Sequence, residues 1–307
     1  MTTDQIVSAL ATVTLIEMML TIGLGVSLRE LINVGANWRL VSRAALANYV
    51  LVPLATIGLV VAFRASPLVA AGLLIAAACP GAPYGPPLTA LARGNVAVAI
   101  GLMVVLAGSS ALLAPLILSV ALPVVSRGDT VRIDALGMVR MLAISQFLPL
   151  CLGLWLRHAR PIVADRLKRP MTRLSTLLNI ALLTLVLVVQ FRTLIHIPIK
   201  AFIGMPTLVA ANAIIGWFVG GPAPENRLSL SLTTAVRNVG LSLAIVTSNF
   251  PGTIAVTAAT TFALFQTVLM AAVAIVWGRG ARAGQARSDQ TEPAGTWNAV
   301  SARECRP

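Results

Sequence analysis

Charged residues are scarce in this sequence, and acidic residues are the scarcest of them. Asp, Glu, Lys and Arg make up 11% of the 307 residues and only 10 are acidic, whereas 57% of the chain is hydrophobic. A water-soluble domain cannot bury so much apolar surface behind so few charged side chains. The composition therefore excludes an ordinary soluble protein and indicates an integral membrane protein.

Cysteine and histidine are also rare, with three Cys and two His in the whole chain. Cys79, Cys151 and Cys305 lie far apart and fit neither a disulfide framework nor the spacing of a metal site. His158 and His196 have no neighbouring ligand residues, and no nucleophile is paired with a base. We therefore predict that the protein is not an enzyme and holds no metal or other cofactor.

Long apolar runs, in contrast, fill the chain. A helix needs roughly 20 mainly apolar residues to cross the hydrocarbon core of a bilayer. Nine such runs lie at 5–27, 38–63, 67–92, 95–122, 137–157, 174–194, 200–221, 227–249 and 253–277. The first contains Glu17 and follows no basic segment, so we expect a retained helix rather than a cleaved signal peptide. The sequence thus predicts one all-α transmembrane domain over residues 1–278.

The 23 Lys and Arg residues cluster between these runs. With an outer N-terminus, 16 of them fall on the inner side, five on the outer side, and two, Arg140 and Arg237, within runs. Basic residues collect in cytoplasmic loops, so we predict an outer N-terminus and a cytoplasmic C-terminus in the inner (plasma) membrane. Topology, rather than nucleic-acid binding, then accounts for the net charge of +13.

Two segments outside the runs are predicted to lack regular structure. The longest connection, residues 158–173, is expected to be a loop and is too short for a separate domain. Residues 279–307 are rich in Gly, Ala, Arg and Ser, which predicts a disordered cytoplasmic tail.

The third run should not form a continuous helix, because it contains four prolines in eight residues. Each of Pro80, Pro83, Pro86 and Pro87 removes an amide donor and clashes with the preceding turn. Backbone left unpaired within a membrane must be buried in protein or line a wet cavity. We therefore predict a break that contributes Pro83, Tyr84 and Gly85 to a substrate-binding site.

The eighth run carries a polar cluster halfway along an apolar span. Thr233, Thr234, Arg237 and Asn238 lie there, followed by Gly240. A guanidinium inside a bilayer costs several kcal/mol unless it faces a partner or water, so such residues are usually functional. We predict a second break here, with these four polar residues in the substrate site.

The two breaks occupy matching places, in the third of the first four runs and the third of the last four. This arrangement is typical of an inverted-repeat transporter whose site lies where two broken helices cross. Free amides and helix N-termini at such a crossing suit an anionic group. Glu17 is the only acid deep in a run. It is expected to pair with Arg237 or to carry a proton, the alternative being that it faces a wet crevice.

These residues resemble the bile acid:sodium symporter family of secondary transporters, over most of the chain to about residue 277. Cys-Pro-Gly at 79–81 and Leu-Ala-Arg-Gly-Asn at 91–95 match two family motifs. Weaker matches are Gly-Leu at 23–24, Val-Pro at 52–53 and Arg-Asn-Val-Gly-Leu at 237–241. The resemblance implies a core bundle with two crossed, broken helices, a panel bundle that rocks against it, and organic anions as substrates. It also implies that Gln266 and Thr267 line the substrate cavity.

The residues that would bind sodium in this family do not carry over. Gly85 and Pro86 stand where the family has a Ser-Asn pair, and Ala99 and Met103 stand where it has hydroxyls. Sodium is a hard cation that needs several oxygen ligands, which these side chains lack.

The second crossing segment departs from the family in the same direction. Thr233 and Arg237 replace a glutamate and a glutamine of the family, Asn238 is kept, and Asn48 replaces a glutamine. Among the family's ligand positions, Asn48 keeps a side-chain oxygen that could coordinate an ion weakly. We therefore count Asn48 as a coupling position together with Glu17 and Arg237. We predict that Arg237 stands in for the bound sodium, which leaves transport independent of sodium, or coupled to protons or exchange.

The sequence therefore predicts a secondary transporter of a small organic anion, a carboxylate or a sulfonate, working by alternating access. Two alternatives stay open. The first is a membrane sensor that keeps the fold but does not transport, which the lost sodium ligands favour. The second is an efflux carrier for a metalloid or another inorganic anion, which Cys79 suggests.

Overall fold

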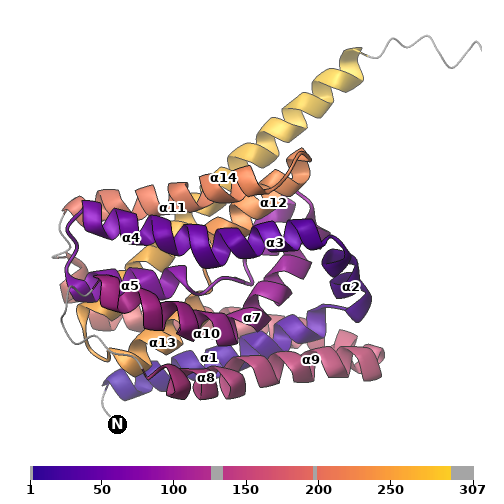
Figure 1. Cartoon of the computed structure of the whole chain (residues 1–307). Helices are drawn as coiled ribbons and strands as arrows, with labels where there is room; N and C mark the ends of the chain where they lie inside the picture. The colour runs from indigo at the N-terminus through magenta and orange to yellow at the C-terminus, as the bar shows by residue number, and fades with distance from the viewer. Residues whose placement is uncertain (1–2, 126–133, 196–198, 292–307) are drawn as a thin grey trace, which may run out of the picture.

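The chain folds into a bundle of helices in the computed structural model, which describes residues 3–125, 134–195 and 199–291. Every regular element in these ranges is a helix, and most run along one common direction (Figure 1). The elements are α1 Thr3–Gly25, α2 Leu28–Ala36, α3 Trp38–Leu46, η1 Ala47–Leu51, α4 Val52–Ala62, α5 Pro67–Ala77, α6 Gly85–Leu91, α7 Val96–Val125, α8 Ala135–Leu142, η2 Ala143–Phe147, α9 Leu148–Ala159, α10 Pro161–Ile195, α11 Ile199–Val219, α12 Pro224–Ala235, α13 Val239–Asn249 and α14 Ile254–Thr291.

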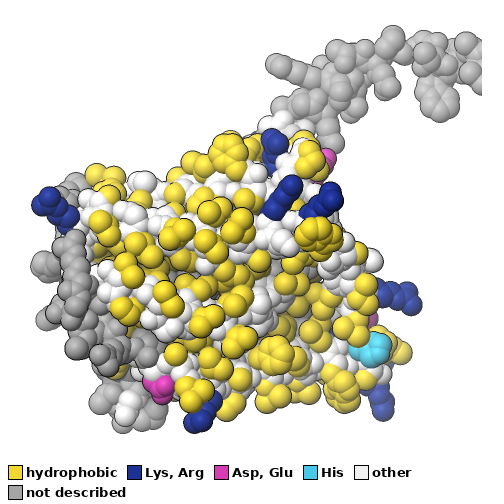
Figure 2. All heavy atoms as spheres, in the orientation of Figure 1, with side chains coloured by type: hydrophobic (Ala, Val, Ile, Leu, Met, Phe, Trp, Pro, Cys, Tyr) yellow, Lys and Arg dark blue, Asp and Glu magenta, His cyan; other side chains and the backbone are white. Residues whose placement is uncertain are grey.

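Seven helical stretches within the described residues are long and apolar enough to cross a bilayer. Two shorter apolar helices, Pro67–Ala77 and Ile203–Val219, accompany them, and each of these nine segments overlaps one predicted run. Hydrophobic side chains cover the middle of the visible face, and most of the visible basic side chains gather at its right-hand end (Figure 2). The predicted all-α membrane architecture is confirmed, whereas the number of crossings stays a prediction.

Two long helices absorb an internal proline by widening a single turn. The segments η1 and η2 are π-helical and contain Tyr49 and Ser145. In a regular α-helix the carbonyl groups of these residues would clash with the rings of Pro53 and Pro149, four residues later. A π turn relieves the clash between a proline ring and the preceding turn without ending the helix. The runs at 38–63 and 137–157 therefore remain continuous, unlike the proline-rich third run.

The helices fall into two groups. The first consists of α1, α9 and α10, which contact one another. Glycines let α1 and α9 approach closely: a Cβ added at Gly23 would lie 2.5 Å from the carbonyl oxygen of Leu150. The second group contains α3 to α7 and α11 to α14, and α1 and α10 meet it through α13 and α14.

Helical structure extends further than predicted in two places. The expected loop at 158–173 is wrong, because α10 begins at Pro161, where proline suits the first turn of a helix. At the other end of the chain, α14 continues beyond residue 278 to Thr291 and projects from the bundle (Figure 1). Ala, Arg and Gln in this segment are strong helix formers. Residues 292–307 of the predicted tail lie outside the described residues.

Candidate functional site

The first break lies between α5 and α6, as predicted. The chain leaves the helix after Ala77, runs without helical structure from 78 to 84, and re-enters at Gly85. Gly81 has φ +81°, a conformation that side chains other than glycine rarely adopt. It also packs on α7, where an added Cβ would lie 2.5 Å from the backbone nitrogen of Ala107.

The second break is shorter and separates α12 from α13. It spans only Val236 to Asn238, and the Asn238 side chain caps α13 by accepting a hydrogen bond from the backbone of Leu241 at 3.0 Å. The two breaks touch: the Asn238 backbone N–H donates to the carbonyl oxygen of Cys79 at 2.8 Å. Gly85 lies against Thr233, whose methyl group is 3.0 Å from the position of a Cβ added at Gly85.

Arg237 is fully buried at this crossing, with 1% of its surface exposed. Its guanidinium donates to the carbonyl oxygens of Ala77, at 3.4 Å, and of Thr234. Both carbonyls belong to the last turns of half-helices, α5 and α12, where unpaired carbonyls concentrate partial negative charge. Within the part of the chain that the structure describes, no carboxylate forms an ion pair with Arg237. Backbone oxygens, rather than a carboxylate, therefore balance the Arg237 charge.

Two side-chain amides brace the crossing. Gln266 of α14 holds the backbone of Arg237 from both sides, accepting from its N–H at 2.9 Å and donating to its carbonyl oxygen at 3.0 Å. Asn48 of η1 donates to the hydroxyl of Thr234 at 3.4 Å and to the carbonyl oxygen of Ala44 at 2.8 Å. The structure thus brings together most of the predicted polar residues.

Thr267 does not belong to this group. Its side chain is exposed on the outside of the bundle and donates to the carbonyl oxygen of Ala263 in its own helix. Successive residues of an α-helix point about 100° apart, so Gln266 and its neighbour cannot both face the crossing. The structure therefore does not bring Thr267 to the crossing.

Glu17 does not pair with Arg237 either. One carboxyl oxygen accepts from the Thr21 hydroxyl at 2.7 Å, and Ser175 of α10 lies beside the same carboxyl. The neighbouring Met18, in contrast, reaches toward α13, where its methyl carbon is 3.2 Å from a Cβ added at Gly240. α1 is thus turned with Glu17 toward α10, and the crossing lies on another side of the helix.

A cavity of about 320 Å³ separates α1 and α10 from the first break. Pro83 and Tyr84, two of the predicted site residues, line it, while Arg237 and the other crossing residues do not. Its remaining walls come from four helices, α1, α6, α7 and α10. The residues are Met18, Thr21, Ile22, Gly25 and Val26 of or next to α1, Ile100 and Met103 of α7, and Lys168, Thr172, Ser175 and Thr176 of α10, together with Pro86 and Pro87.

The polar wall supplied by α10 was not predicted from the sequence. Lys168, Thr172, Ser175 and Thr176 follow one another at helical spacing, which places them on one face. Reading residues 158–173 as a loop hid this periodicity. A polar stripe that continues into an apolar span is the signal that identifies such a wall.

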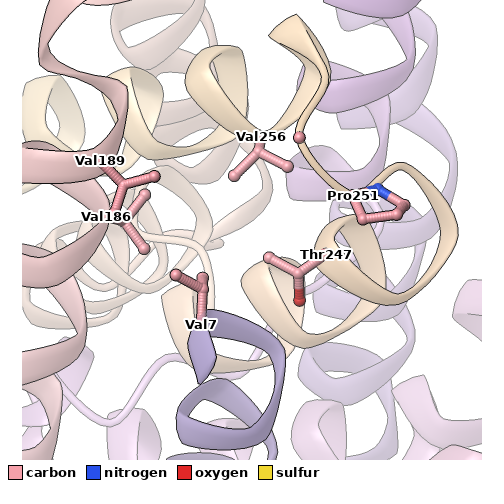
Figure 3. Close-up of a pocket in the computed structure, with 7 residues that line it drawn as sticks. Val7, Val186, Val189, Thr247, Pro251 and Val256 are labelled. Atoms are coloured by element: carbon pink, nitrogen blue, oxygen red, sulfur yellow. The ribbon is translucent and has the colours of Figure 1, made fainter. Parts of the chain in front are cut away.

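The opposite end of the same interface is closed. Val7 of α1, Val186 and Val189 of α10, and Val256 of α14 point toward one another (Figure 3). With Thr247, Pro251 and Gly252 they enclose only about 10 Å³, which is at the lower limit for one water molecule. The interface between the two helix groups is therefore hollow at one end and closely packed at the other.

Two discontinuous helices that cross inside a multi-pass bundle, beside a cavity open at one end, define the class of secondary transporters. The sequence pattern of the Sodium Bile acid symporter family matches residues 12–198, more than half of the chain. The chain belongs to this family and is a multi-pass membrane transporter. The match includes the first break and the cavity walls but stops before the second break. No curated protein matches the chain.

Proposed function

We propose that the protein carries a small organic anion across the membrane by alternating access, with the cavity between α1, α10 and the first break as its binding site. The observation that carries this proposal is the asymmetry of one interface. It holds about 320 Å³ at one end and about 10 Å³ at the other. A carrier that exposes its site to one side at a time needs such an arrangement, and its reversal delivers the solute.

The cavity chemistry favours a monoanion with an apolar body. Lys168 is the one charged side chain among its lining residues, Thr21, Thr172, Ser175 and Thr176 add hydroxyl groups, and the remaining walls are largely apolar. Its volume lies at the small end of ligand pockets. We therefore propose a small carboxylate or sulfonate as substrate.

Arg237 is proposed to act as a fixed cation in place of a bound sodium ion. Its guanidinium already occupies two carbonyl oxygens at the ends of α5 and α12, which are the kind of ligand that a hard cation seeks. A second cation beside a buried guanidinium would be strongly repelled. Sodium coupling is then unnecessary for holding the crossing together, and transport is expected to proceed without it.

The proposed topology has nine crossings in an inverted repeat, with an outer N-terminus in the inner membrane. The open cavity borders the last turn of α1 and the basic first half of α10, including Lys168. Basic segments favour the cytoplasmic side, so the cavity opens to the cytoplasm in this conformation. The alternative of a metalloid carrier depended on Cys79, whose side chain is fully buried, so we favour the organic anion.

Thermal stability of the purified protein tests the substrate class. Pyruvate, benzoate, benzenesulfonate and taurocholate are added separately, in sodium and in potassium buffers, and a bound anion raises the Tm. We expect stabilisation by at least one of them, equal in both buffers. Lys168→Ala should reduce this shift, whereas Arg29→Ala, which removes an exposed arginine at the same end of α1, should not. Shifts that require sodium, or no shift with any anion, would contradict the proposal.

A further inference from the structure

We infer that Glu17 is the proton-binding group that couples anion movement to protons, an inference that rests on the proposed function. The side chain is 7% exposed, and one of its oxygens, Oε2, has no hydrogen-bond partner. The other oxygen accepts from Thr21. Both Thr21 and Ser175, which lies beside the same carboxyl, line the cavity. Glu17 therefore sits directly behind the cavity wall.

The surroundings of this carboxyl suit a group that alternates between charged and neutral forms. An ionised carboxylate buried among apolar groups needs hydrogen-bond donors or a cation at its oxygens. Here the Thr21 hydroxyl donates to Oε1, the Ser175 hydroxyl lies beside the carboxyl, and Oε2 has no hydrogen-bond partner. A carboxylic acid would place its own hydrogen on the unpartnered oxygen, and the charge would vanish. The structure thus provides a place for one proton in an otherwise uncompensated site.

Few other ionisable groups surround α1. Of the elements packed against it, α13 and η2 carry no ionisable side chain, and α9 carries Cys151, Arg157 and His158. The charged residues in the first half of α10 are Asp165, Arg166, Lys168, Arg169 and Arg173. Of these, only Lys168 lines the cavity, and it forms no ion pair with Glu17.

Lys168 and Glu17 together determine whether a proton and an anion bind together or exclude each other. The pair contributes no net charge to the cavity when Glu17 is ionised, and one positive charge when it is protonated. An anion therefore binds more favourably to the protonated form, and by linkage a bound anion favours proton uptake by the same factor. The expected stoichiometry is one proton carried with one monoanion in the same direction.

Infrared spectroscopy tests proton binding without a substrate. The protein in lipid membranes is compared at acidic and alkaline pH, and a protonated carboxyl group gives a C=O stretching band above the amide I region. We expect a titrating band that Glu17→Gln removes and Glu30→Gln keeps. Glu30 is a matched control, because its exposed carboxylate forms a capping box with Ser27 that Gln also supports. Identical band changes in the wild type and in Glu17→Gln would overturn the inference.

Transport in proteoliposomes tests the coupling. Benzenesulfonate and taurocholate are the probes, because sulfonates stay ionised and do not cross lipid as neutral acids. An inwardly directed proton gradient should drive accumulation by the wild type, and Glu17→Gln should exchange the probe across the membrane without accumulating it. Uptake that does not depend on the proton gradient would overturn proton coupling. Failure of the wild type to move either probe, with the infrared band present, would count against the proposed sulfonate transport and leave proton binding by Glu17 standing.

Discussion

The two helix breaks that meet in this protein differ in length, composition and charge. The first is seven residues long, from Ala78 to Tyr84, contains two prolines and a glycine, and carries no charge. The second needs only three residues, Val236 to Asn238, and one of them is a buried arginine. One break is produced by residues that cannot continue a helix, and the other is held by side chains that satisfy its backbone.

The two breaks therefore make different contributions: the first mainly shapes the site, and the second provides its buried charge. The first break supplies a wall of the cavity, and the helix end before it supplies the carbonyl oxygen of Ala77. The second supplies the guanidinium that donates to this oxygen, and the cap that starts α13. A break made by several closely spaced prolines is fixed by the local sequence, whereas a break held by hydrogen bonds depends on each partner. Substitutions at the two breaks should therefore fail in different ways.

Removal of the Arg237 guanidinium is expected to have the largest effect. Arg237→Ala leaves the carbonyl oxygens of Ala77 and Thr234 without this donor, at about 1–3 kcal/mol for each buried group. It also removes the charge that joins the two breaks, so uptake of benzenesulfonate should be lost.

Added guanidinium ion should restore part of this uptake by occupying the vacated space. Arg227→Ala is the control, because Arg227 also donates to a backbone oxygen, that of Gly221 at 2.6 Å, but lies outside the crossing. Equal losses in both variants, or no response to guanidinium, would refute a fixed-cation role.

Gly81→Ala tests the break that depends on shape. The new side chain must adopt φ near +81° and would lie 2.5 Å from the backbone of Ala107. The strained conformation and the overpacking together should lower stability by about 3–4 kcal/mol, measured as a fall in Tm. Gly58→Ala adds a methyl group that meets no atom within 4 Å, so its Tm should be unchanged or higher. A tolerated Gly81→Ala would show that the first break is more adaptable than its geometry indicates.

The sequence predicted both breaks for good physical reasons, since prolines and a charge inside an apolar run have few structural solutions. It also predicted that Arg237, Asn238 and Gln266 matter, and the structure places them at one crossing. It did not predict their partners. Every residue has a backbone carbonyl group, so a sequence does not show which carbonyl oxygens an arginine contacts. A carboxylate such as Glu17 was therefore the expected counter-charge for Arg237.

The polar wall of α10 was missed for a different reason. Lys168 and Thr172 precede the apolar run, and hydropathy alone assigns such residues to a loop. The helix that carries them continues without interruption from Pro161. Orientation around a helix axis is equally hidden, which is why Gln266 and Thr267 were grouped together although they point in different directions. Local patterns locate breaks well, but packing decides which side chains meet.

Gln266→Leu should have an intermediate effect, and it tests whether hydrogen bonds hold the second break. Leucine keeps most of the volume but removes both bonds to the Arg237 backbone, whose buried N–H and carbonyl groups lose these partners. We expect a loss of about 2–3 kcal/mol, measured as a fall in the denaturant or thermal midpoint. Thr267→Val is the matched change on the outer face and should leave the midpoint unaltered. A midpoint that falls equally in both variants would mean that α14 packing, rather than the amide clamp, is responsible.

Asn238→Ala should have the smallest effect, and it separates the cap from the contact between the breaks. The substitution removes the side-chain bond to the Leu241 backbone but keeps the backbone N–H that donates to Cys79. Loss of a helix cap costs about 1 kcal/mol, so the Tm should fall slightly while transport persists. Asn238→Ser restores a capping oxygen and should recover most of the stability. If Asn238→Ala instead abolished transport with little change in Tm, and Asn238→Ser did not restore it, the side chain would act on the substrate path rather than as a cap. The second break would then share the binding role that we propose for the first.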